Sequence, residues 1–101
     1  MERDSGTDAW ILYAVDIAAS RAPASLTDIS RAADAINHAV PTQRELNGSL
    51  AWLRIQGLVE SQGRFHHLSE KGRHFVAQAQ RGASTVGLVW ANLGAALRPL
   101  R

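Results

Sequence analysis

Stretches in which apolar residues recur every three or four positions alternate along the chain with short polar stretches. This spacing is that of an amphipathic helix, with one apolar face. It predicts five helices, at residues 8–20, 26–37, 42–56, 70–80 and 84–97. Between the third and fourth helices the pattern changes to two short extended runs, 58–61 and 64–68, around a Gln62-Gly63 turn. The chain is therefore predicted to be mainly α-helical with a small β-hairpin.

The segment 41–60 carries the clearest local signals. Thr42 and Glu45 have the spacing of a capping box, in which each side chain bonds the other residue's backbone N–H. Gly57 suits the left-handed conformation that ends many helices. The buried stripe consists of three leucines at helical spacing, Leu46, Leu50 and Leu53. A helix, a glycine stop and a strand are thus expected in direct succession.

Other boundaries carry signals of the same kind. Thr7 or Asp8 can cap the first helix, and Ser69 precedes the fourth. Ser25 and Asp28 offer a second capping box. Residues 21–24 are expected to be a connector between the first two helices.

Size and composition narrow the protein class. At 101 residues the chain can form one domain with a hydrophobic core, but not two. It has no cysteine, which excludes disulfides and cysteine-based zinc sites. Residues 1–8 are polar and acidic, so no secretory signal is expected. These features favour a protein of the reducing cytoplasm.

Charge is distributed unevenly. Residues 1–60 carry five Arg against eight Asp or Glu. Residues 61–101 carry six Lys or Arg against one Glu. An anionic partner is therefore expected to meet the hairpin and the C-terminal half. The alternative is ordinary surface charge that keeps the protein in solution.

The order helix, helix, turn, helix, hairpin, helix resembles the winged helix-turn-helix superfamily. The residues that carry the resemblance are Leu50, Leu53, Gly57, Leu58, Val59 and Glu60, followed by the wing-like run QGRFHHLSEKG from Gln62 to Gly72. The resemblance covers residues 8–80, and the stretch 34–47 is similar to one in small uncharacterised bacterial winged-helix proteins. It implies a winged-helix domain at 1–81 and a C-terminal helix at 82–101 for dimerisation or core packing.

The hairpin departs from the family pattern, because two residues rather than one separate Phe65 from Leu68. Phe65 and Leu68 would then face opposite sides of a regular strand. A bulge at His66-His67 would return both to the core. Without a bulge, His66 rather than Phe65 faces inward.

The resemblance implies a small bacterial transcriptional regulator that binds duplex DNA through the helix Thr42–Gln56 and the wing around Gly63. If the leucines point inward, the opposite helix face would enter the major groove. Arg pairs with guanine and Asn with adenine there, each through two hydrogen bonds. The residues expected to contact DNA are Thr42, Gln43, Arg44, Asn47, Arg54 and Arg64. The alternative is a winged-helix protein–protein interaction module that binds no DNA.

The last helix has a large apolar stripe. We expect a homodimer that uses the first and last helices, through Trp10, Val86, Trp90, Leu93 and Leu97. The alternative is that the stripe folds back on the first helix of the same chain. The uncharged run 82–97 is shorter than the roughly 20 residues of a membrane span, so no membrane partner is expected. With no separate effector domain, an effector of unknown chemistry would sit at the dimer interface.

Catalytic and metal-binding patterns are weak. The sequence contains no GxSxG elbow, no phosphate-cradling glycine loop and no suitably placed carboxylate pair, so no enzyme activity is expected. His66, His67 and His74 are close in sequence, but neighbouring strand residues face opposite sides. Neither a metal site nor a cofactor is expected.

Overall fold

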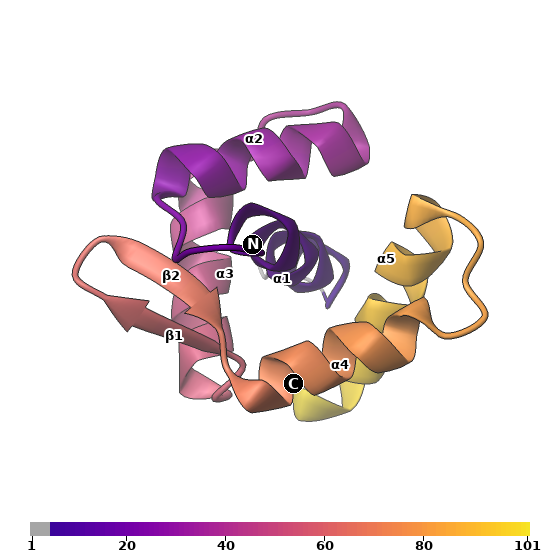
Figure 1. Ribbon diagram of the computed structural model, residues 1–101. Helices are drawn as coiled ribbons and strands as arrows, with labels where there is room; N and C mark the ends of the chain where they lie inside the picture. Colours follow the sequence, from indigo (N-terminus) through magenta and orange to yellow (C-terminus); the bar gives the residue numbers. More distant parts are fainter. Residues whose placement is uncertain (1–4) are drawn as a thin grey trace.

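The computed structural model describes residues 5–101, which form five α-helices and one antiparallel hairpin (Figure 1). In chain order the elements are α1 (Ser5–Ala18), α2 (Leu26–Asn37), α3 (Gln43–Ile55), β1 (Val59–Gln62), β2 (Phe65–Leu68), α4 (Glu70–Gln80), α5 (Val86–Leu97) and the 3-10 turn η1 (Arg98–Leu100). The predicted mainly helical architecture with a small hairpin is confirmed. None of these helices is long and apolar enough to span a membrane, over residues 5–101.

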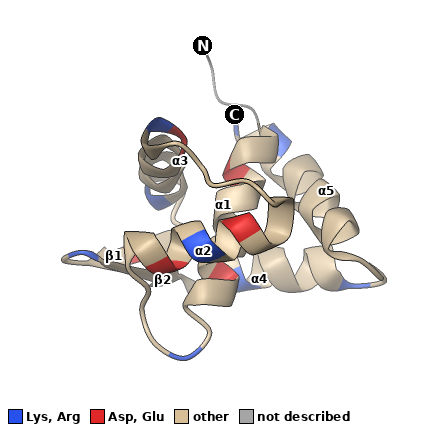
Figure 2. Ribbon diagram, turned by 90° about the horizontal axis from the view of Figure 1, so that it is seen from above, with Lys and Arg blue, Asp and Glu red and all other residues tan. Residues whose placement is uncertain are grey.

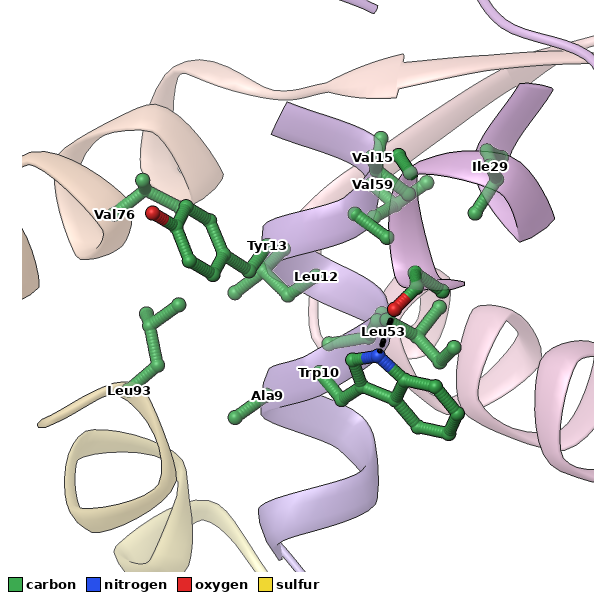
Figure 3. Close-up of a cluster of buried hydrophobic side chains, with 14 of the residues drawn as sticks. Ala9, Trp10, Leu12, Tyr13, Val15, Ile29, Leu53, Val59, Val76 and Leu93 are labelled. Atoms are coloured by element: carbon green, nitrogen blue, oxygen red, sulfur yellow. Dashed lines mark hydrogen bonds between the residues drawn. The ribbon is translucent and has the colours of Figure 1, made fainter. Parts of the chain in front are cut away.

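Helix α1 is the centre of the molecule, with the other elements arranged around it (Figure 1). Every residue from Asp8 to Val15 is buried, which explains the unusually wide apolar arc of this helix. Side chains reach α1 from several directions, and Val76 of α4 and Leu93 of α5 approach Tyr13 and Ala9 (Figure 3). The helix begins at Ser5, so the prediction that Thr7 or Asp8 caps it is wrong.

The local signals around α3 are confirmed. Thr42 Oγ1 accepts from the Glu45 N–H at 3.0 Å, and Glu45 Oε1 accepts from the Thr42 N–H at 2.9 Å. The same reciprocal pair joins Ser25 and Asp28 at the start of α2. The helix stripe is buried as predicted, at Leu46, Leu50 and Leu53. The chain leaves α3 through Gly57, which has a φ of 77°.

The hairpin is regular and has no bulge. Its register pairs Val59 with Leu68 and Gln62 with Phe65, which leaves Gly63 and Arg64 as the turn. The predicted Gln62-Gly63 tip is therefore wrong by one residue, because Gln62 still belongs to the ladder. Phe65 is 45% exposed, whereas His66 is buried. Of the two alternatives for this strand, the inward-facing His66 is the one observed.

The connector between α1 and α2 joins the hairpin, which the sequence pattern does not reveal. Ala24 forms an isolated antiparallel bridge with His66. The Ala24 N–H donates to the His66 carbonyl, and the His66 N–H donates to the Ala24 carbonyl, both at 2.8 Å. β2 is therefore paired along β1 on one edge and at a single residue on the other.

Helix α4 docks tightly on the start of the hairpin through Ser69. The Ser69 hydroxyl donates to the Gly57 carbonyl at 2.6 Å and accepts from the Gly72 N–H at 3.0 Å. The Ser69 N–H donates to the Leu58 carbonyl at 3.0 Å. This brings the first turn of α4 so close to Leu58 that a Cβ on Gly72 would overlap the Leu58 carbonyl oxygen.

Helix α5 packs on α1 and α4 of its own chain. Three of the residues predicted for a dimer interface are buried in this single-chain core, namely Trp10, Leu93 and Leu97. Val86 is 46% exposed, and Trp90 is half-buried with its ring centroid 6.1 Å from that of Trp10. The predicted alternative, in which the stripe folds back on the first helix, accounts for the three buried residues.

Candidate nucleic-acid interface

The side of α3 opposite its leucines forms one exposed stripe. Arg44, Asn47, Ala51 and Arg54 follow one another at helical spacing, and all four are exposed. With a rise of about 1.5 Å per residue, the two arginines lie about 15 Å apart along the axis. Gln43 is exposed at the start of the helix. The predicted outward placement of these residues is confirmed.

The hairpin tip adds a third cationic position. Arg64 is exposed in the two-residue turn, and Figure 2 shows blue segments at the tip and towards both ends of α3. Thr42 is exposed too, but its hydroxyl already accepts from the Glu45 N–H. Glu45 beside Arg44 carries a negative charge, so α3 has a net charge of one positive unit from two Arg and one Glu.

A groove separates α3 from β1. It has a volume of about 640 Å³, and its lining residues are Ala51, Arg54, Ile55, Val59, Glu60 and Ser61. Ile55 is 79% exposed, which is unusual for a large aliphatic side chain. The groove thus combines apolar side chains with one cation, Arg54, and one anion, Glu60, and is not uniformly basic.

His66 lies on the buried side of the hairpin. Its Nδ1 lies 2.6 Å from the Ser61 hydroxyl, and its backbone pairs with Ala24. Burial lowers the pKa of His66 below its ordinary 6.5, and the positive charge of Arg54 lowers the pKa further. The neutral imidazole is therefore the form that the folded protein favours.

We predict that this histidine makes stability depend on pH. As pH falls through 6.5 the unfolded chain takes up the proton first, because the folded pKa is lowered. The stabilisation from neutral His66 is present above pH 6.5 and is lost as pH falls towards the folded pKa. Urea unfolding at about pH 8 and about pH 5.5 should show the higher free energy of unfolding at the higher pH.

The variant His66→Asn should flatten that dependence, because an amide can still bond Ser61 but does not titrate. His38→Asn is the matched control. His38 is exposed at the end of α2 with a φ of 55°, a conformation that Asn adopts readily. The control should keep the pH dependence of the parent. An unchanged pH dependence in His66→Asn would contradict the assignment to His66.

A buried polar network fixes α3 against α1. The side chain of Asp8 is fully buried, and its Oδ1 accepts from the Ser49 hydroxyl of α3 at 2.9 Å. Its Oδ2 accepts from Arg101 Nε at 2.9 Å, and Arg101 Nη2 donates to the same oxygen. The Arg101 guanidinium also lies 4.6 Å from the ring centroid of Trp52, on α3. Sequence reasoning missed this network because 93 positions separate Asp8 from Arg101.

The remaining histidines do not converge on one site. His67 Nε2 lies 3.1 Å from Glu60 Oε1, and His74 Nε2 lies 3.2 Å from the Gln78 amide. Within residues 5–101, no three His, Asp or Glu side chains are grouped so that they could hold a metal ion. No family model, no curated protein and no solved structure matches the chain.

Proposed function

We propose that the protein is a winged helix-turn-helix regulator of transcription that binds duplex DNA. The observation that carries this proposal is the exposed stripe of Arg44, Asn47 and Arg54 along α3, with Arg64 at the neighbouring hairpin tip. The bridge between Ala24 and His66 supports the winged-helix assignment, since it pairs the connector between the first two helices with the hairpin at one residue.

In this proposal α3 enters the major groove, which is wide enough for one helix. Arg44, Asn47 and Gln43 lie in its N-terminal half, where they would read base edges. Arg54 and Arg64 would hold phosphates on either side. Thr42 would act through its cap on the helix start, since its hydroxyl is already engaged.

The test measures binding to duplex DNA by fluorescence anisotropy at a series of salt concentrations. Arg64→Ala should weaken binding on every sequence and reduce the salt slope by about 1, because one phosphate contact is lost. On a duplex selected from a random pool, Arg44→Ala should cost about 1–3 kcal/mol, as expected for one bidentate base contact.

Arg81→Ala is the control for a general loss of positive charge. Arg81 is exposed at the C-terminal end of α4 and belongs neither to the α3 stripe nor to the hairpin tip. Its substitution should change affinity less than either of the other two. If Arg44→Ala and Arg64→Ala both bind DNA like the parent protein, the proposed interface is wrong.

The second candidate is a protein–protein interaction module, favoured by the exposed apolar residues near α3. Ile55 is 79% exposed and Val40 is 68% exposed. These side chains suit an apolar partner surface better than a phosphate backbone. This candidate predicts a stable complex in a pull-down, its loss in Ile55→Asp, and no salt-sensitive retention of DNA.

We further propose that the protein acts as a homodimer. With Leu93 and Leu97 buried, the pairing surface would be the exposed side of α5 that carries Leu88, which is 47% exposed. Val86 is 46% exposed in the first turn, but it lies two positions away and on another face of the helix. Small residues on the Leu88 side, Ala91 and Ala95, would let a second helix approach closely. Sedimentation equilibrium gives the oligomeric state, which should be known before any DNA affinity is interpreted.

A further inference from the structure

A pocket lies apart from the α3 stripe, between the end of α1 and the junction of β2 with α4. Its volume is about 570 Å³, within the range of about 300–1,000 Å³ found for small-molecule sites. The residues that line it are Val15, Asp16, Ile17, Ala19, Ser20, His67, Leu68 and Arg73. The end of α1 and the junction of β2 with α4, which are distant in sequence, therefore meet around one concave surface.

An anion and a cation share this lining. Asp16 is half-buried, and across residues 5–101 its carboxylate has neither a hydrogen bond nor an ion pair. Burial raises the pKa of Asp16 above its ordinary 3.8, because the carboxylate has lost part of its hydration. Arg73 donates from Nη1 to the Leu68 carbonyl at 3.0 Å, and no carboxylate of the described chain pairs with it.

The rest of the lining is largely aliphatic. Val15, Ala19 and Leu68 contribute to it, and Ile17 is 42% exposed although it is a large apolar side chain. Apolar area that can be covered by a ligand favours binding by roughly 25 cal/mol per Å². The pocket thus offers one negative group, one positive group, the imidazole of His67 and an apolar surface.

We propose that this pocket binds a small zwitterion with an aliphatic body, the chemistry of an apolar α-amino acid. The ligand ammonium would pair with the Asp16 carboxylate, which has no partner in the described chain. The ligand carboxylate would accept hydrogen bonds from Arg73, whose planar guanidinium suits a carboxylate. The aliphatic body would lie on Ile17 and Leu68. A simple amine would meet the repulsion of Arg73, and a simple carboxylate that of Asp16.

In the experiment the full chain is titrated with L-valine and with L-leucine, and binding is monitored through the amide chemical shifts in NMR. Saturable shifts at the end of α1, in β2 and at the start of α4 are expected with at least one of them. Isobutylamine and 3-methylbutanoate, which are valine without its carboxylate and without its amino group, should bind at least tenfold more weakly. The carboxyl pKa of Asp16 should fall on binding, because the ammonium stabilises the charged form.

Two variants test the assignment of the charges. Asp16→Asn and Arg73→Gln should each weaken binding at least tenfold, whereas Arg81→Gln should bind like the parent. The shift pattern of each ligand-free variant shows whether it is folded. The proposal is overturned if neither amino acid gives saturable shifts up to about 10 mM, ample to detect a Kd near 1 mM. It is also overturned if isobutylamine binds as well as valine, or if the shifts map elsewhere. None of these measurements depends on DNA.

Discussion

Replacing Gly72 with alanine is expected to destabilise the protein by about 3 kcal/mol or more, although it adds only one methyl group. The new Cβ would overlap the carbonyl oxygen of Leu58, which is backbone and cannot rotate away. Relief requires α4 to move from the hairpin, which strains the Ser69 bonds to Gly57 and Leu58. Urea unfolding followed by far-UV circular dichroism gives the free energy of unfolding.

Gly87→Ala is the matched control, because it makes the same change in another helix. The nearest atom to a Cβ at Gly87 is the Thr85 hydroxyl oxygen, at 3.9 Å, an ordinary contact. Alanine has the higher helix propensity, so this variant should be unchanged or more stable by up to about 1 kcal/mol. Equal effects from the two substitutions would show that α4 does not dock on Leu58 as described.

Asp8→Ala is expected to destabilise the protein by about 1–3 kcal/mol, because it leaves a buried hydrogen-bond donor without its acceptor. The substitution removes the acceptor for the Ser49 hydroxyl, which is fully buried. It also removes the carboxylate that holds the Arg101 guanidinium beside Trp52. Because Ser49 and Trp52 both belong to α3, the loss should loosen α3 as well as lower global stability.

A double-mutant cycle with Arg101→Ala separates the ion pair from the other contacts of Asp8. Coupling of about 0.5–3 kcal/mol is expected for groups in one hydrogen-bonded network. Arg98→Ala, an exposed residue of η1, serves as the control and should change stability little. If Arg101→Ala changes the free energy of unfolding as little as Arg98→Ala does, the ion pair between Asp8 and Arg101 does not contribute to stability.

Features decided by neighbouring residues could be predicted from the sequence. The capping boxes of α2 and α3 each need only residues three positions apart. The exposed stripe of α3 followed in the same way, because a helix that buries Leu46, Leu50 and Leu53 must turn Arg44 and Asn47 outward. These predictions needed no knowledge of which element covers the leucines.

Features decided by distant residues could not be predicted in this way. An apolar stripe does not specify its partner, so Leu93 and Leu97 were compatible with a second subunit and with α1. Ala24 carries no strand signal, and it pairs with His66 only because folding brings the connector beside β2. Asp16 and Arg73 likewise share a pocket through tertiary packing alone.

The bridge between Ala24 and His66 also determines where the chain can tolerate insertions. It anchors β2 to the body of the protein two residues beyond the Gly63-Arg64 turn. Residues inserted into that turn would lengthen a loop outside the anchored part. Doubling a loop length costs only about 0.6 kcal/mol. The reach of the tip can therefore change during evolution while the packing of α1, α2 and α3 is preserved.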